Sequence, residues 1–410
     1  MKIQRCKGTR DLSPEEMARF RLIEGTFRDY CLKWGYKEVR TPTLEYLHLF
    51  TSTGTLTPSM LGKVYSFLDW DGWSGERVVL RPDGTIPVAR LYIDSMEGED
   101  LTKLFYIANV FIFEATGKKT RERWQCGAEL IGAGAPSADA ELVMLALEVL
   151  KRLKLEGVEI RLSHAGLIKA LLAKLGLSAD EQTRMFDRIL DGDTEVLAKF
   201  KLERPELGKT LYSLLELKGK SAEFAKKLKA LFAQDLPEFK PYIDGCTKIA
   251  ELLEALDCDY QIDIASGRGF EYYTGVIFQF FKGEDKIGGG GRYDALIPLM
   301  GGGDTPACGF ALYLDRLMNL VKPEDLAKPS GQSVLIRAEP QAAKEGFSLA
   351  TRLHEAGYRA EFYLGAQKAA DFDWTLDIQS KAPKFVLTDQ VKGQKVTAKT
   401  AGEVLKLLKR

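Results

Sequence analysis

The first strong pattern in the chain is a helical one. Its apolar positions recur at helical spacing, at Met17, Phe20, Ile23, Phe27 and Tyr30. The preceding Ser-Pro-Glu-Glu run at residues 13–16 has the form of a capping box with proline in the first helical turn. The pattern predicts an amphipathic helix from about residue 14 to Trp34, and its apolar stripe is expected to face a hydrophobic core.

From Tyr36 to about residue 132 the pattern changes to short β-rich runs that are separated by turns. Such a series is typical of an antiparallel sheet. A helix is expected over about residues 139–153, and sheet character returns near residue 259. We expect a further helix over about residues 309–320.

Residues 165–255 differ from the segments on either side, because they contain short helical patterns and few strand signals. We therefore predict an α+β fold in which residues 1–164 and 256–325 form one core, interrupted by a helical insertion at 165–255. Prolines and glycine near residues 323–331 mark a boundary. Beyond it, strands and helices alternate, which predicts a small α/β domain over residues 326–410.

Composition restricts the possible classes of protein. The 410 residues are 45% hydrophobic and 28% charged, with 58 basic and 58 acidic residues, which is typical of two or three globular domains. The zero net charge disfavours non-specific binding of nucleic acid through bulk charge. Six scattered cysteines without a CxxC motif and only three histidines give no sign of a zinc site, and we expect neither a metal nor a cofactor. We expect a cytoplasmic protein with no membrane segment, because the chain contains no long apolar run.

Single motifs in the chain are weakly informative. The run IGGGGRYD at residues 287–294 lacks the lysine of a phosphate-binding P-loop, so a tight turn explains it equally well. Glu114 and Glu129 taken alone are ordinary strand charges, and Tyr272-Tyr273 is an ordinary aromatic pair.

The order of the motifs along the chain is more informative about the protein family than any single motif. The chain resembles histidyl-tRNA synthetases in segments spread over residues 1 to about 320: KGTRDLSPEE, GYKEVRTPTLEY, LRPDGTIPVAR, NVFIFEATGKKTRERWQCGAELIG, GRGFEYYTGVIF, GGGGRYDALI and PACGFALYLDRL. The resemblance implies a class II aminoacyl-tRNA synthetase-like antiparallel sheet flanked by helices, dimeric through the segment around Pro42.

The same resemblance implies a histidine pocket. It places Asp83, Thr85 and Gln125 at the α-amino group of histidine, and Arg268 at the carboxylate. It places Glu129 and Tyr273, with the adjacent Tyr272, around the imidazole ring. These residue types suit a ligand with an ammonium, a carboxylate and a polar ring. Asp83 stands where synthetases commonly have glutamate, which keeps the charge and shortens the side chain by one methylene.

The ATP side departs from the synthetase pattern. Ile112 and Glu114 lie in an element where synthetases have a phosphate-binding arginine at the isoleucine position. Loss of one such donor typically costs on the order of 10²–10³ in rate. Tyr313 replaces a small residue in the last motif. Arg316 is retained, and a structural role and residual nucleotide binding are both open for it.

The C-terminal part resembles a shortened anticodon-binding domain. Residues 331–410 carry 13 basic and 9 acidic residues, which fits a solvated basic face as well as a tRNA-binding surface. We do not expect tRNA as a partner.

A synthetase-like chain with a histidine pocket and an altered ATP site is similar to the regulatory subunits of ATP phosphoribosyltransferase. That resemblance implies no catalysis by the chain itself, a short-form catalytic subunit as partner, L-histidine as effector, and a homodimer within a hetero-oligomer. Two alternatives remain open. One is an active, divergent histidyl-tRNA synthetase, and the other is a synthetase-like binding module with a different target.

Overall fold

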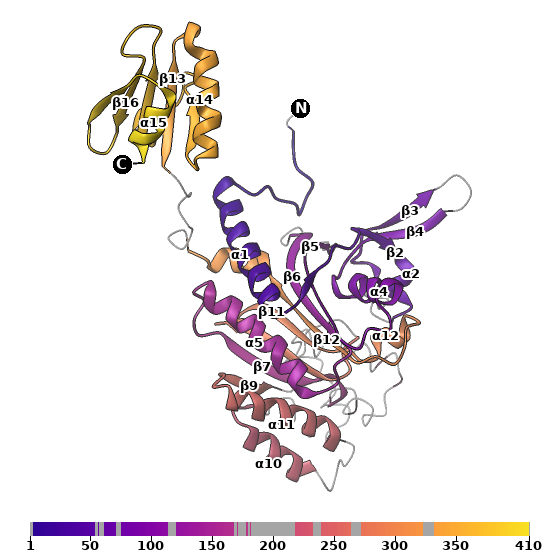
Figure 1. The fold of residues 1–410 in the computed structure, drawn as a ribbon. Coiled ribbons are helices and arrows are strands. Elements are labelled where there is room, and N and C mark those ends of the chain that lie inside the picture. The colour runs from indigo at the N-terminus through magenta and orange to yellow at the C-terminus, as the bar shows by residue number, and fades with distance from the viewer. Residues whose placement is uncertain are drawn as a thin grey trace. The chain divides into compact units, whose positions relative to one another are not determined.

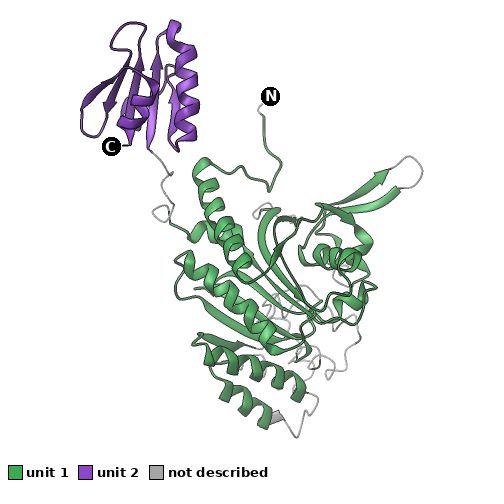
Figure 2. Cartoon of the chain, viewed as in Figure 1, with its two compact units in different colours: residues 1–325 green, residues 326–410 purple. Residues whose placement is uncertain are grey.

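The chain forms two compact units, residues 1–325 and residues 326–410 (Figure 2). This computed structural model describes residues 3–53, 56, 61–70, 75–113, 120–167, 170, 178, 181, 218–232, 239–263, 272–322 and 332–409. Each unit has its own hydrophobic core. How residues 1–325 divide into a core and an insertion remains a prediction.

Helix α1 (Pro14–Lys33) begins where the sequence predicts. The Ser13 side chain accepts a hydrogen bond from the Glu16 backbone, and the Glu16 carboxylate accepts one from the Ser13 backbone. This confirms the capping box, which satisfies two backbone donors at the helix start. Phe20, Ile23 and Phe27 are buried, as the apolar stripe predicts.

A nine-stranded sheet forms the centre of the first unit (Figure 1). Its spatial order is β1 (Lys37–Glu38), β5 (Thr102–Phe111), β6 (Glu122–Ile131), β12 (Ala307–Tyr313), β11 (Asp285–Arg292), β10 (Val276–Lys282), β7 (Glu159–His164), β9 (Tyr260–Asp263) and β8 (Lys218–Gly219). All neighbouring pairs are antiparallel except β1 with β5 and β7 with β9. The predicted α+β class with an antiparallel sheet is confirmed.

The expectation of a helix over residues 309–320 is wrong in its first half. Residues 307–313 are strand β12, and helix α13 (Leu314–Leu320) begins only afterwards. The segment Gly-Phe-Ala-Leu-Tyr alternates between the two faces of the sheet and pairs with β6 on one side and β11 on the other. Pairing on both edges outweighs the weak helical preference of this short segment.

The two faces of the sheet differ in character. On one face Phe105, Ala128, Phe278 and Phe310 are buried in the main core, together with residues of α1 and α5 (Pro136–Arg152). On the other face the register aligns Glu129 of β6 with Gly309 of β12, and Gly309 with Gly291 of β11. The second face therefore has little side-chain bulk around one acidic residue.

Shorter elements lie on this glycine-rich side. A three-stranded sheet consists of β2 (Leu44–Tyr46), β4 (Gly75–Leu80) and β3 (Ser66–Trp70), and the short helices are α2 (Leu47–Thr51), α4 (Thr85–Ser95) and α12 (Leu296–Leu299). Residues of α2, α4 and α12 form a separate apolar cluster with Tyr272, Tyr293 and Ile131. Tyr272 and Tyr293 are therefore packed among apolar side chains on this side of the sheet.

Two described helices, α10 (Ala222–Phe232) and α11 (Lys240–Ala255), pack on each other within the segment predicted to be an insertion. Helix α11 also contacts α5, and its buried residues join the main core.

The second unit is a small α/β domain. Its sheet has the order β14 (Arg359–Phe362), β13 (Ser333–Ala338), β15 (Trp374–Ile378), β16 (Phe385–Asp389) and β17 (Lys395–Ala398). Its helices are α14 (Ala343–Glu355) and α15 (Ala401–Leu408), which cover one face of that sheet. In the described parts of both units, no helix has the length and apolar character needed to cross a membrane.

Candidate functional site

Glu129 lies in the middle of the glycine-rich face and is 1% exposed. A Cβ atom on Gly309, its neighbour on β12, would lie 1.7 Å from Glu129 Oε2, so only glycine leaves room for this carboxyl group. The Thr85 hydroxyl at the start of α4 donates to Glu129 Oε1 at 2.7 Å, and the Tyr293 hydroxyl donates to Oε2. Burial raises the pKa of Glu129 to about 8, although both hydrogen bonds lower it.

Asp83 is the second buried carboxyl group of the site. It lies in the turn before α4 and is 3% exposed. Its Oδ1 accepts the backbone N–H of Ile86 at 2.9 Å, and its Oδ2 accepts the Tyr272 hydroxyl at 3.4 Å. Burial raises the pKa of Asp83 to about 6, against the lowering effect of these donors.

Neither carboxyl group has an ion-pair partner among the described residues. Uncompensated buried carboxylates are costly, and the raised pKa values of both groups reflect that cost. The arrangement is therefore suited to a ligand that brings a positive charge or strong hydrogen-bond donors.

Tyrosine rings enclose the two carboxyl groups. The Tyr272 and Tyr273 rings lie 4.9 Å apart, and the Tyr293 ring meets Tyr272 edge-on at 5.5 Å. Tyr106 of β5 packs over backbone, because a Cβ atom on either Gly84 or Gly127 would lie 2.4 Å from its hydroxyl oxygen. Burial raises the pKa values of all four phenols well above the usual range. They therefore act as neutral hydrogen-bonding groups.

Gln125 and Tyr313 form the neighbouring part of the same face, since they pair across β6 and β12. The buried Oε1 of Gln125 has no hydrogen-bond partner among the described residues. Tyr313 is half-buried. Burial raises the pKa of its hydroxyl, the nearby charges of Arg123 and Arg316 lower it, and the charge of Asp83 raises it further. Tyr313 is therefore close enough to both the acidic site and these two arginines to feel their charges.

The structure describes Ile112, Tyr313 and Arg316 of the residues predicted for the ATP side. Ile112 is half-buried just after β5, and its backbone N–H donates to the Arg121 carbonyl at 2.9 Å. Arg316 is exposed in the first turn of α13. Glu114 and Arg268 lie outside the described residues.

The structure thus brings Asp83, Thr85, Glu129 and Tyr272 into direct contact, with Tyr273 against Tyr272. Sequence reasoning missed two members of the site, Tyr293 and Tyr106. Tyr293 lies inside the glycine run that was interpreted only as a tight turn, and its position directly after a strand of small residues was the available signal.

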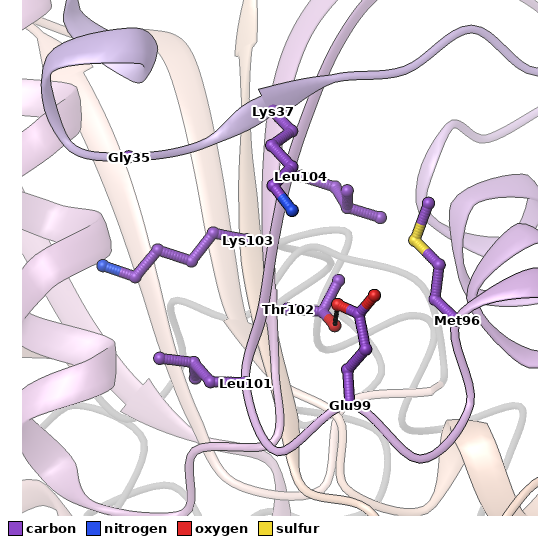
Figure 3. Close-up of a pocket in the computed structure, with 8 residues that line it drawn as sticks. All are labelled: Gly35, Lys37, Met96, Glu99, Leu101, Thr102, Lys103 and Leu104. Carbon is purple, nitrogen blue, oxygen red and sulfur yellow. Dashed lines mark hydrogen bonds between the residues drawn. The ribbon is translucent and has the colours of Figure 1, made fainter.

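A separate surface pocket of about 250 Å³ lies at the edge of the sheet (Figure 3). Its lining comes from β1 and the turn before it, and from β5 and the segment that joins it to α4: Gly35, Lys37, Met96, Glu99, Leu101, Thr102, Lys103 and Leu104. None of these residues is a predicted site residue, and the Glu99 carboxylate already accepts a hydrogen bond from Thr102. Within the described ranges, no group of three or more His, Cys, Asp or Glu side chains could hold a metal ion.

Known proteins resemble this chain over nearly its whole length. Residues 8–317 match the family model of histidyl-tRNA synthetase. The chain is 52% identical over 407 residues to the ATP phosphoribosyltransferase regulatory subunit of Dehalococcoides mccartyi strain BAV1, which covers 99% of this chain and 98% of that protein. It is 33% identical over 380 residues to the histidine–tRNA ligase of Methanocaldococcus jannaschii, with 89% and 87% covered.

Solved structures show the same fold. An ATP phosphoribosyltransferase regulatory subunit/histidyl-tRNA synthetase from Bacillus halodurans has a TM-score of 0.76 at 24% identity, with 93% of this chain and 100% of that chain covered. Histidyl-tRNA synthetase from Nostoc has a TM-score of 0.74 at 21% identity, with 100% and 99% covered.

Proposed function

Because the chain belongs to the histidyl-tRNA synthetase-like family of ATP phosphoribosyltransferase regulatory subunits, we propose that it senses L-histidine for a short-form catalytic subunit. In this proposal the chain itself catalyses nothing. It is required for the activity of its partner at the first step of histidine biosynthesis, and bound histidine lowers that activity.

The pair of buried carboxyl groups without a cation, Asp83 and Glu129, is the observation that supports histidine as the ligand. Histidine carries an α-ammonium group and an imidazole ring, which are the complements of two such groups. We assign the ammonium to Asp83, with Thr85 and Gln125 beside it, because the Gln125 carbonyl oxygen is a buried acceptor with no partner in the described chain.

We assign the imidazole to Glu129. Its carboxyl group is already oriented by Thr85 and Tyr293, so binding does not require it to lose rotamer freedom. Tyr272 and Tyr273 would bound the ring. Arg268, which lies outside the described residues, is the proposed partner of the histidine carboxylate.

The proposal also requires that histidine is bound and not consumed. Ile112 offers neither a charge nor a side-chain donor to an α-phosphate, and Tyr313 places a phenol near both Asp83 and Arg316. Together with Glu114 these residues define a degenerate ATP site, and the chain is inferred to form no adenylate.

Regulation needs a partner whose state depends on histidine. A coupling free energy of roughly 1–3 kcal/mol between the histidine pocket and the catalytic subunit would suffice for inhibition. We infer a homodimer of this chain within a hetero-oligomer in the cytoplasm. We do not propose tRNA as a partner of this chain.

The test is to mix the purified chain with a short-form ATP phosphoribosyltransferase and to measure product formation with and without histidine. We expect activation by the chain and inhibition by histidine. We expect Glu129→Gln to weaken inhibition while preserving activation.

Glu141→Gln is the matched control, because Glu141 bonds to Tyr36 and Lys103 and not to the site. Absence of both activation and co-purification would overturn the proposed function. Histidine-dependent exchange between ATP and pyrophosphate would favour the divergent synthetase instead.

A further inference from the structure

A buried ion pair lies behind the candidate site. Arg292, the last residue of β11, is 9% exposed, and Asp139 in the first turn of α5 is 1% exposed. The Arg292 Nη2 and Nε atoms donate to Asp139 Oδ2 at 2.7 and 3.1 Å. Burying both charges carries a desolvation cost that offsets much of their attraction. The pair is therefore better explained by the segments it holds in place than by added stability.

The guanidinium also binds the connection between β6 and α5. Its Nη1 donates to the Ala133 carbonyl at 3.0 Å and to Asp294 Oδ1 at 3.1 Å. Ala133 is the second residue after the end of β6, the strand that carries Glu129. The pair therefore joins the end of that strand to β11.

The backbone of Arg292 holds a second segment. Its carbonyl oxygen accepts the N–H groups of Thr274 at 2.9 Å and Gly275 at 3.1 Å. The N–H of Asp294 donates to the Thr274 hydroxyl at 3.0 Å. These three hydrogen bonds fix the turn that immediately follows Tyr272 and Tyr273.

The next residue, Tyr293, reaches the site directly. Its N–H donates to the Ala307 carbonyl at 2.8 Å, and its hydroxyl donates to Glu129. Asp294 Oδ1 accepts the Ala307 N–H at 3.0 Å, which ties β12 to the same group of residues.

We propose that Asp139 and Arg292 are positioning residues that set Tyr272, Tyr273 and Tyr293 against the two buried carboxyl groups. They do not touch the ligand. They act because the ion pair anchors Arg292, and Arg292 holds two neighbouring backbone segments: Tyr293, which is the next residue, and the turn that follows Tyr272 and Tyr273. The identity of the ligand in the test rests on the proposed function, but the positioning itself does not.

The decisive variant is Asp139→Asn, which keeps the shape and removes the charge. We expect histidine affinity, measured by calorimetry, to fall roughly tenfold, within the range of interaction energies in one hydrogen-bond network. Asp139→Glu should recover part of the loss, and Glu141→Gln, two residues along the same helix, should change nothing.

A second readout does not need histidine. The Tyr293 hydrogen bond favours the ionised form of Glu129. If the ion pair positions Tyr293, Asp139→Asn should raise the pKa of Glu129 in the ligand-free protein. Carbon-13 NMR of labelled glutamate carboxyls would measure it, with the Glu129 signal assigned from the Glu129→Gln variant.

The outcomes separate the two proposals. A folded Asp139→Asn variant with wild-type histidine affinity and an unchanged Glu129 titration would overturn the positioning role. If the wild-type chain binds no histidine, the proposed function fails, while the NMR titration still decides the positioning role. If Asp139→Asn does not fold, Asp139→Glu keeps the charge and moves it by one methylene; the NMR titration of Glu129 should again shift, and an unchanged titration would overturn the positioning role.

Discussion

The proton on Glu129 gives the sharpest prediction for histidine binding. With a pKa of about 8, most of the Glu129 carboxyl is protonated at pH 7 in the ligand-free protein. Imidazole has an ordinary pKa of about 6.5 and is mostly neutral there. The complex needs one proton between the two groups, whether it lies on the carboxyl or on the ring. Both acid and alkali should therefore weaken binding.

The size of the effect follows from the two pKa values. With Glu129 titrating near 8 and the ring near 6.5, affinity should peak near pH 7.2 and fall about eightfold by pH 5.5 and by pH 9. In Glu129→Gln the amide cannot titrate, so the alkaline fall due to this group disappears. The variant should bind about 5–30-fold more weakly at pH 7, because a charge-assisted hydrogen bond is replaced by a neutral one.

Isothermal titration calorimetry between pH 5.5 and 9.5 would measure the histidine affinity of the wild-type chain and of Glu129→Gln. The ratio of the wild-type to the variant affinity cancels the titration of the histidine amino group and of Asp83, which both proteins share. This ratio should shrink about tenfold from pH 7 to pH 9. A ratio that does not change with pH, or a variant that binds as tightly as the wild type, would refute the assignment of the ring to Glu129.

Four further predictions follow from the same geometry. Asp83→Asn should abolish most of the preference for histidine over 3-(imidazol-4-yl)propanoate, which lacks the amino group, in competition calorimetry. The free energy of unfolding of the ligand-free protein should fall as pH rises from 4.5 to 8, because the folded state keeps the Glu129 proton that the unfolded state loses; melting of Glu129→Gln should depend less on pH. Gly309→Ala should cost about 1–3 kcal/mol of stability and weaken histidine binding, since its Cβ would overlap the Glu129 carboxyl, as denaturant titration and calorimetry can check. Ile112→Arg combined with Tyr313→Gly should bind ATP more tightly than the parent chain in calorimetry, and equal affinity would contradict the degenerate-site assignment.

Local signals in the sequence were sufficient for local structure. The capping box at Ser13 and the apolar stripe of α1 depend on residues within a few turns of one another, so their spacing determines the outcome. Residues 309–313 were misassigned because their state depends on pairing with β6, about 180 residues earlier in the chain. The sequence of a short apolar segment does not indicate which distant strand it will pair with.

The candidate site was predicted by resemblance more than by physical reasoning. Nothing in the local sequence of Glu129 distinguishes it from an exposed strand charge, and its burial arises from the register with Gly309 and from the contacts of Thr85 and Tyr293. Tyr293 could have been inferred only by recognising that the glycine run is a strand. The contribution of Asp139 was inaccessible from sequence, because it depends on the meeting of α5 with the end of β11.

Substitutions on the two faces of the nine-stranded sheet are expected to have different effects. Changes at Phe105 or Phe310 act on the packed core and affect whether the chain folds. Changes around Glu129 and Tyr313 alter what the other face can hold, while most of the core remains intact. A fold built this way can exchange one chemistry for another in a few steps, and a catalyst can become a receptor without having to rebuild its scaffold.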